Sequence, residues 1–264
     1  MKLALAQLDV DAGDVETNRE RALEAIAAAA DRGVDLVALP ELWNVGFFAF
    51  DRYADLAEPL DGPTFSAIAE AAADHGIGVL GGSIVEDLSS SDGGPADEGY
   101  ANATVLFDRD GDRLFTYRKR HLFGYESAEA QLLVPGESLG VAEFEGFTVG
   151  ATTCYDLRFP ELYRELVDEG VTLVLVPSAW PYPRVEHWTT LPRARAIENL
   201  SYVATINGAA TFDEATLLGR SSVYDPWGTV VAGSSDEPTL VTAEVDPDRV
   251  ATVREEFPAL SDRR

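Results

Sequence analysis

The chain has 264 residues and carries 46 acidic against 20 basic side chains, a formal net charge of −26. A surface this acidic repels nucleic-acid phosphates and anionic lipid head groups, so neither nucleic acid nor membrane is expected as a partner. Hydrophobic residues make up 46% of the chain, which supports a substantial core and excludes disorder of the bulk of it.

Strands and helices alternate along the first half of the chain. Residues 3–6 read as a strand, residues 15–30 as an alanine-rich amphipathic helix, and the apolar run 34–39 as a buried strand that ends at Pro40-Glu41. Further along, the pattern predicts a helix at 65–74, a strand at 78–84, an exposed loop at 88–98, and a hairpin formed by 100–107 and 112–117.

The second half continues this alternation. Strands are expected at 147–154, 171–176, 202–206, 221–224, 230–232 and 240–245, helices at 160–169 and 187–199, and an arginine-bearing tail at the end. Hairpin strands mixed with βα units argue against a purely parallel sheet and favour two mixed sheets packed face to face, with helices outside. Because no linker or repeat is visible, residues 1–264 are expected to form a single domain.

Lysine is nearly absent from the chain. Only Lys2 and Lys119 occur, so arginine supplies the other 18 of the 20 basic residues. Lysine's long apolar stem adds surface that water at high salt solvates poorly, whereas carboxylates stay hydrated and concentrated salt screens their repulsion. We therefore expect a halophilic organism with a salt-rich cytoplasm; an ordinary acidic protein is the alternative.

The single cysteine, Cys154, excludes an intramolecular disulfide and indicates a reducing compartment. Met1 leads into an expected strand and not into a signal segment. No apolar stretch approaches the length of a membrane-spanning helix. These features predict a cytoplasmic protein.

Cys154 is also a candidate nucleophile. It ends the expected strand 147–154, and Pro160 beyond it suits the first turn of a helix. A sulfur in such a bend lies at the rim of a sheet, and the positive end of a helix favours the thiolate. The alternative is a small buried apolar residue, which is the usual state of a lone cysteine.

A thiol nucleophile needs a base, and two kinds are available. His121 and His187 lie in semi-polar stretches, so a Cys–His pair stays open, whereas His75 falls at a helix end. Glu41 ends an apolar strand, at the edge where ligand sites of α/β proteins gather, and is the better placed proton acceptor. Its alternative role is that of a capping or surface glutamate.

Lys119 is informative because arginine replaces nearly every other lysine. A compact ammonium can point at a single oxygen, whereas a planar guanidinium spreads its charge and donors. An oxyanion that forms on an amide or nitrile carbon calls for such a point charge. Lys119 is therefore a candidate for stabilising that oxyanion.

Three segments resemble, in order, the signature blocks of the nitrilase-like carbon–nitrogen hydrolases. They are Pro40-Glu41-Leu42-Trp43, Tyr117-Arg118-Lys119-Arg120-His121-Leu122-Phe123 and Cys154-Tyr155-Asp156-Leu157-Arg158-Phe159-Pro160-Glu161. Residues 188–199 and 225–228 are also similar to family sequence, so the resemblance covers practically the whole chain. One block alone carries little weight, but all three in order are highly specific.

The resemblance implies a four-layer α-β-β-α sandwich and a catalytic triad of Glu41, Lys119 and Cys154. Glu41 would take the thiol proton, and Lys119 with the backbone N–H of Tyr155 would hold the oxyanion. Ammonia or an amine would leave, and water would then hydrolyse the thioester. No metal or organic cofactor is implied, and the sequence shows no metal-ligand cluster.

The resemblance also implies roles for several single residues outside the three blocks or within the substrate pocket. The family often has a second glutamate that orients the lysine, and Glu129 matches its spacing to Pro135-Gly136 better than Glu126 does. Trp180 resembles a residue of the pocket wall. The surrounding segment is similar to members that deaminate 2-oxo-acid ω-amides, whose carboxylate Arg158 and Arg184 are candidates to bind.

The sequence therefore predicts an amidase that releases ammonia from a small linear amide. Nitrile hydrolysis, a Cys–His hydrolase using His121 or His187, and a non-catalytic binding protein on the same fold remain alternatives. The resemblance also implies a homodimer or a larger assembly of identical chains. Residues 158–169 and 188–199 are the candidates for burial between subunits.

Overall fold

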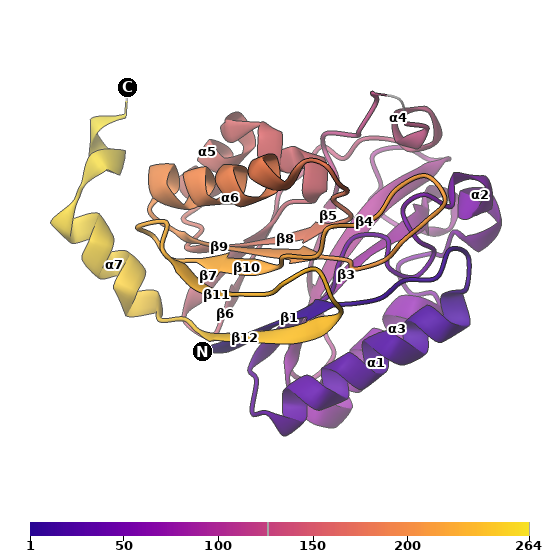
Figure 1. The fold of residues 1–264 in the computed structure, drawn as a ribbon, viewed down its shortest axis with the longest axis horizontal. Helices are drawn as coiled ribbons and strands as arrows, with labels where there is room; N and C mark the ends of the chain where they lie inside the picture. The colour runs from indigo at the N-terminus through magenta and orange to yellow at the C-terminus, as the bar shows by residue number, and fades with distance from the viewer. Residues whose placement is uncertain (126, 264) are drawn as a thin grey trace.

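The computed structural model describes residues 1–125 and 127–263. Two six-stranded sheets pack face to face, and helices cover the outer face of each (Figure 1). Parallel and antiparallel neighbours occur in both sheets. The prediction of a four-layer α-β-β-α sandwich with two mixed sheets is confirmed.

The first sheet has the strand order β12-β1-β2-β3-β4-β5. Its central strands β1, β2 and β3 are parallel, and β4 and β5 form the expected antiparallel hairpin. Two helices, α1 (Val15–Asp31) and α3 (Pro63–His75), lie side by side against its outer face (Figure 1). The strands are β1 (Lys2–Gln7), β2 (Leu36–Ala38), β3 (Gly78–Asp87), β4 (Tyr100–Phe107), β5 (Arg113–Arg118) and β12 (Thr239–Glu244).

The second sheet has the strand order β11-β10-β9-β8-β7-β6 and repeats the same plan. Its parallel strands are β7, β8 and β9, and two helices, α5 (Pro160–Asp168) and α6 (Val185–Asn199), cover it. The strands are β6 (Gly140–Phe144), β7 (Phe147–Ala151), β8 (Leu173–Ser178), β9 (Tyr202–Asn207), β10 (Ser222–Tyr224) and β11 (Val230–Gly233).

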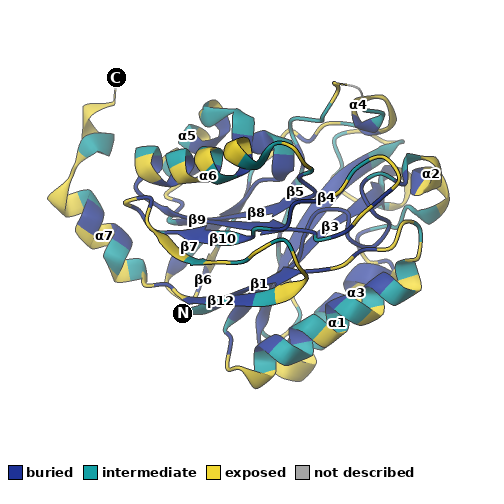
Figure 2. Cartoon of the chain, in the orientation of Figure 1, coloured by how far each residue is buried: buried dark blue, intermediate teal, exposed yellow. Residues whose placement is uncertain are grey.

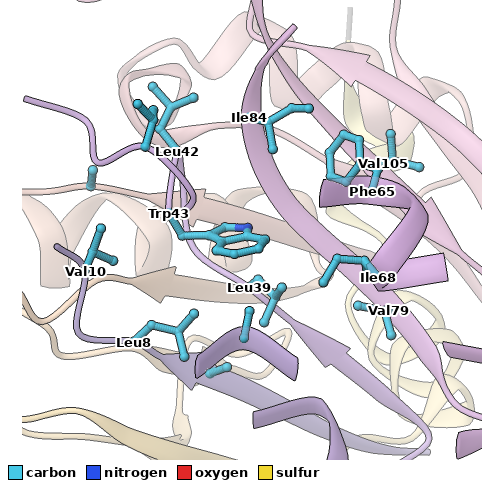
Figure 3. Packing of buried hydrophobic residues seen from close by; sticks show 14 of the residues in the cluster. Leu8, Val10, Leu39, Leu42, Trp43, Phe65, Ile68, Val79, Ile84 and Val105 are labelled. Atoms are coloured by element: carbon cyan, nitrogen blue, oxygen red, sulfur yellow. The ribbon is translucent and has the colours of Figure 1, made fainter. Parts of the chain in front are cut away.

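The central strands are buried on both faces, which explains their continuous apolar runs. In β1, Leu3 and Leu5 join the core between the sheets, whereas Ala4 and Ala6 pack toward α1 and α3. Figure 2 shows the central strands as the most deeply buried elements. Figure 3 shows the outer core, where Trp43 lies among side chains of the first sheet and of α3.

Several shorter elements were not expected from the sequence. They are β6, α2 (Tyr53–Leu56), α4 (Glu129–Leu132), α7 (Pro247–Glu256) and the 3₁₀ helices η1 (Phe50–Arg52), η2 (Leu88–Ser90) and η4 (Ala259–Asp262). The arginine-bearing tail forms α7, because Val250 and Val253 are buried and Arg254 donates to the carbonyl oxygens of Val171 and Leu200. Leu88, expected in an exposed loop, is buried.

The expected strand 147–154 is wrong at its end. β7 stops at Ala151, and Cys154 begins the 3₁₀ helix η3 (Cys154–Arg158). The physical reason is that the carboxylate of Asp156 accepts the backbone N–H of Thr153 at 2.9 Å, which turns the chain out of the sheet.

The two lysines have different environments. Lys2 is partly exposed and donates to the carbonyl oxygen of Arg32, whereas Lys119 is completely buried. No exposed ion pair within residues 1–125 and 127–263 uses lysine; Arg109 with Asp35 and Glu145 is an example of the arginine pairs. Among the helices of these residues, none has the length and apolarity needed to cross a membrane.

Candidate active site

Glu41 lies where the two sheets approach each other, just beyond the carboxyl end of β2. Its side chain is buried, and Oε2 accepts the backbone N–H of Ala179, at the end of β8, at 2.9 Å. Gly82, with φ of 62°, lets the chain turn closely around this point, since an added Cβ would lie 2.2 Å from the carbonyl oxygen of Pro40. The Glu41 carboxylate is therefore fixed between the sheets.

Lys119 follows β5 and directs its ammonium at two carboxylates. Nζ donates to Oε1 of Glu41 at 2.8 Å and to both oxygens of Glu129, at 2.8 and 2.9 Å. It also lies 5.5 Å from the centre of the Phe47 ring. An ammonium has three N–H donors, and three carboxylate oxygens lie within hydrogen-bond distance of this one, two of them on Glu129. A substrate oxygen would therefore take over one of the two contacts to Glu129.

Glu129 begins α4 and is completely buried. Besides Lys119, its Oε2 accepts the backbone N–H of Phe123 at 2.7 Å. The structure thus brings Glu129 to Lys119, as the family spacing predicts. The alternative residue, Glu126, lies outside the described residues.

Cys154 stands at the turn between β7 and α5 with a backbone φ of 47°. A residue with a Cβ adopts this left-handed conformation only when its surroundings hold it there. Asp156 supplies one restraint, because its buried carboxylate also accepts from Tyr117 Oη and from the backbone N–H of His121. Arg195 of α6 supplies another by donating twice to the carbonyl oxygen of Leu157.

The ionisation of the cluster follows from burial and from its neighbours. Burial alone lowers the pKa of Lys119, but the carboxylates of Glu129 and Glu41 outweigh it and raise the pKa above its ordinary value. Burial raises the pKa of the Cys154 thiol well above its ordinary value, and Glu41 adds to this. Burial and Glu41 thus oppose the thiolate that a nearby helix was expected to favour, and a thiol with a raised pKa needs a proton acceptor to become a nucleophile.

Cys154 lines a cavity of about 320 Å³ whose walls are largely aromatic. This volume suits a small molecule. Tyr155 and Trp180, the two residues expected from the sequence to bind substrate, line this cavity. Its other aromatic walls come from Phe47, Phe48, Phe50, Phe123, Tyr125 and Tyr182.

Two arginines line the same cavity. The guanidinium of Arg158 stacks near the rings of Trp180 and Tyr155, and that of Arg184 near Phe123. No ion pair joins either arginine to a carboxylate of the described residues, although acidic residues far outnumber basic ones in this chain. One carboxylate, Glu214, also lines the cavity, so the two arginines outnumber the acidic residues there and favour an anionic ligand.

The histidines make contacts elsewhere. Nδ1 of His121 lies 2.7 Å from Asp156 and its ring stacks on Phe159, while Nδ1 of His187 lies 3.1 Å from Arg158. Neither lines the cavity beside Cys154. In the described part of the chain, no group of three or more His, Cys, Asp and Glu side chains is arranged to hold a metal ion.

Sequence reasoning missed one member of the cluster, Asn102 of β4. It is buried, and its Nδ2 donates to Glu41 at 2.9 Å and to Glu129 at 3.2 Å. The signal in the sequence was a single amide inside a mostly apolar strand, since a buried amide in such a place needs polar partners.

The comparison with known families agrees with this geometry. The family model described as carbon–nitrogen hydrolase matches residues 2–255. The chain belongs to the carbon–nitrogen hydrolase family. It is therefore an enzyme that cleaves carbon–nitrogen bonds, and the match extends over both sheets and every residue of the cluster.

Individual members of the family are similar over the whole chain. A 2-oxoglutaramate amidase of Paenarthrobacter nicotinovorans is 35% identical over 100% of this chain and 90% of its own length. An omega-amidase of Xenopus tropicalis is 34% identical over 100% of this chain and 95% of its own. Among solved structures, a variant of the amidase from Nesterenkonia sp. AN1 is 27% identical and superposes with a TM-score of 0.86 over 100% of this chain and 94% of its own. That structure has the acetamide moiety of fluoroacetamide on its active-site cysteine.

Proposed function

We propose that this carbon–nitrogen hydrolase removes ammonia from a small linear amide that carries a carboxylate at its other end, the class of the 2-oxo-acid ω-amides. The observation that carries the proposal is that Arg158 and Arg184 line the cavity of Cys154 without a carboxylate partner among the described residues. The names of the 2-oxoglutaramate amidase and the omega-amidase support the same class.

The first half of the reaction forms a thioester. Glu41 takes the proton of the Cys154 thiol, and the sulfur attacks the amide carbon. Lys119 and the backbone N–H of Tyr155 stabilise the resulting oxyanion; Tyr155 lies in the first turn of η3, where helix N–H groups have no partner within the helix. The carbon–nitrogen bond then breaks, and Glu41 returns the proton so that ammonia leaves.

The second half regenerates the enzyme. Water attacks the thioester carbon while Glu41 accepts a proton from it, and the carboxylic acid leaves as the sulfur recovers its proton. Glu129 holds the Lys119 ammonium in place through both halves, and its charge keeps that ammonium protonated. A histidine base is disfavoured, because neither His121 nor His187 lines the cavity of Cys154; the first contacts Asp156 and the second contacts Arg158.

The carboxylate preference predicts a measurable discrimination between substrates. We expect kcat/KM for ammonia release from a 2-oxo-acid ω-amide to exceed that of the chain-matched neutral amide by about 10²-fold, the scale of a charge-assisted hydrogen bond in a desolvated site. Arg184→Leu is expected to remove most of this advantage through KM and to leave the neutral amide unaffected.

The matched control is Arg113→Leu, because Arg113 is exposed on β5 and lies outside the cavity. This variant should behave as the wild type toward both amides. Equal rates for the charged and the neutral amide in the wild type would contradict the proposed substrate class, whatever the Arg184 variant does.

We further infer that the chain is adapted to high salt and that identical chains assemble through the α5 and α6 surface. Lysine depletion, the charge of −26 and arginine as the cation of the exposed ion pairs support the first inference. The family and the exposed Ile197 and Trp227 near the end of α6 support the second. The chain is proposed to be one domain and to work in a reducing cytoplasm, where Cys154 stays free.

Salt is therefore expected to stabilise this protein. The melting temperature should rise with KCl concentration, because screening removes repulsion among carboxylates, and light scattering should give the mass of a dimer or larger assembly in the same solutions. A melting temperature that peaks at low salt would argue against halophilic adaptation, and a monomer mass at all salt concentrations would argue against the assembly.

A further inference from the structure

Asn102 contacts every charged member of the proposed catalytic cluster. Its Nδ2 lies 2.9 Å from Oε1 of Glu41 and 3.2 Å from Oε1 of Glu129. The backbone carbonyl oxygen of Asn102 accepts the backbone N–H of Lys119 at 2.9 Å. The Lys119 ammonium also contacts Oε1 of Glu41 and Oε1 of Glu129, each at 2.8 Å. An ammonium and an amide thus share the same pair of oxygens.

The charges of Glu41, Glu129 and Lys119 explain why an uncharged hydrogen-bond donor is useful between the two carboxylates. Two carboxylates share one ammonium in a site without solvent exposure, so they repel each other at close range. An amide adds two N–H donors but no charge. It holds both carboxylates together without giving the site a second cation, which would stabilise the ionised carboxylate and make it a weaker proton acceptor.

The orientation of the Asn102 amide is determined by these contacts. Only its NH₂ group can face two carboxylate oxygens, and its Oδ1 has no hydrogen-bond partner among the described residues. An unpaired buried carbonyl destabilises the fold. This defect is shared by other buried side chains, such as Asn199, so what distinguishes Asn102 is that its NH₂ group faces both carboxylates of the cluster.

The contacts also separate the two oxygens of Glu41. Oε1 accepts from Lys119 and from Asn102, whereas Oε2 accepts the backbone N–H of Ala179 and no other hydrogen bond from the described residues. A carboxylate oxygen that already accepts from an ammonium and an amide holds an added proton weakly. Oε2 is therefore the oxygen that remains available for the thiol proton.

We propose that Asn102 is a positioning residue, which occupies Oε1 of Glu41 together with Lys119 and so directs Oε2 as the base toward Cys154. This inference rests on the proposed function. Without Asn102, the Glu41 carboxylate loses a hydrogen-bond donor that favours its charged form, and it can accept the thiol proton on either oxygen. The base is then less well oriented toward Cys154.

The test compares Asn102→Leu and Asn102→Asp with the wild type. For ammonia release we expect kcat to fall by about 10²-fold, within the range of general acid–base catalysis, with KM changed little. The acidic limb of the kcat/KM profile should move to higher pH in both variants, and further in Asn102→Asp, where a third carboxylate faces the other two. Alkylation of Cys154 by iodoacetamide, followed against pH, should show the same displacement.

Asn199→Leu is the matched control. Asn199 is also 1% exposed, also leaves its Oδ1 without a partner among the described residues, and lies in α6 away from the cluster. It should lower the melting temperature as Asn102→Leu does without moving the acidic limb.

An acidic limb that stays in place in both Asn102 variants would overturn the proposal. If Asn102→Leu fails to fold, the nearly isosteric Asn102→Asp still decides it. If the wild type releases no ammonia from any amide, the proposed function fails, and the alkylation profile of Cys154 then tests the positioning role by itself.

Discussion

Cys154→Ala is expected to lower the rate of ammonia release by about 10⁴-fold or more, the scale found when a hydrolase loses its nucleophile. The variant retains the cavity, Glu41 and Lys119, but it has no atom that can form the thioester. The measurement is ammonia release from a 2-oxo-acid ω-amide under saturating conditions, with substrate binding followed separately by calorimetry. Binding should persist, since the arginines of the cavity are unchanged.

Cys154→Gly separates catalysis from folding. It should be as inactive as the alanine variant, but it should melt at an equal or higher temperature, because glycine adopts a φ of 47° without strain. Full activity in either variant would refute the thioester mechanism.

Lys119→Arg is expected to lower kcat by about 10²–10³-fold, the effect of removing one oxyanion donor. The ammonium is completely buried, with a carboxylate oxygen of Glu41 at 2.8 Å and of Glu129 at 2.8 Å, so a larger planar guanidinium cannot take the same position. The matched control is Lys2→Arg, which changes the only other lysine at a partly exposed site and should have no effect. A retained rate in Lys119→Arg would refute the point-charge role.

The neutral variant Lys119→Met tests the electrostatics of the same site. It leaves two buried carboxylates without a cation, which should lower the free energy of unfolding by about 3–5 kcal/mol at neutral pH. Burial raises the pKa of Glu129 above its ordinary value even though Lys119 opposes this. The folded chain therefore holds that proton more tightly than the unfolded chain, and stability falls as pH rises between the two pKa values.

The pH dependence of the Lys119→Met variant then follows. Without the charge of Lys119, the pKa of Glu129 in the folded chain departs further from its pKa in the unfolded chain. The variant should therefore lose most stability at neutral pH and approach the stability of the wild type as the pH is lowered. Thermal melting of both proteins across this range measures the difference. A stability deficit that stays constant with pH would contradict the assignment of Glu129 as an ionised partner of Lys119.

Some elements could be predicted because their signals are local. The buried strands show as apolar runs, and Pro160 marks the first turn of α5, as the structure confirms. β6 and α7 were missed, because β6 has an irregular burial pattern and α7 is held by contacts of Val250, Val253 and Arg254 with distant parts of the chain. Contacts of this kind leave no local pattern.

The sequence by itself determined the layers of the fold, the family and the identity of the three residues proposed as the triad, because apolar periodicity and the three signature blocks are properties of neighbouring residues. Only the tertiary structure decided the burial that raises the pKa of Cys154, the bridging position of Asn102 and the gathering of Arg158 and Arg184 around one cavity. The reason is that pKa values and hydrogen-bond geometry depend on groups remote in sequence: Glu41 and Lys119 are separated by 78 positions, yet their side chains meet at 2.8 Å.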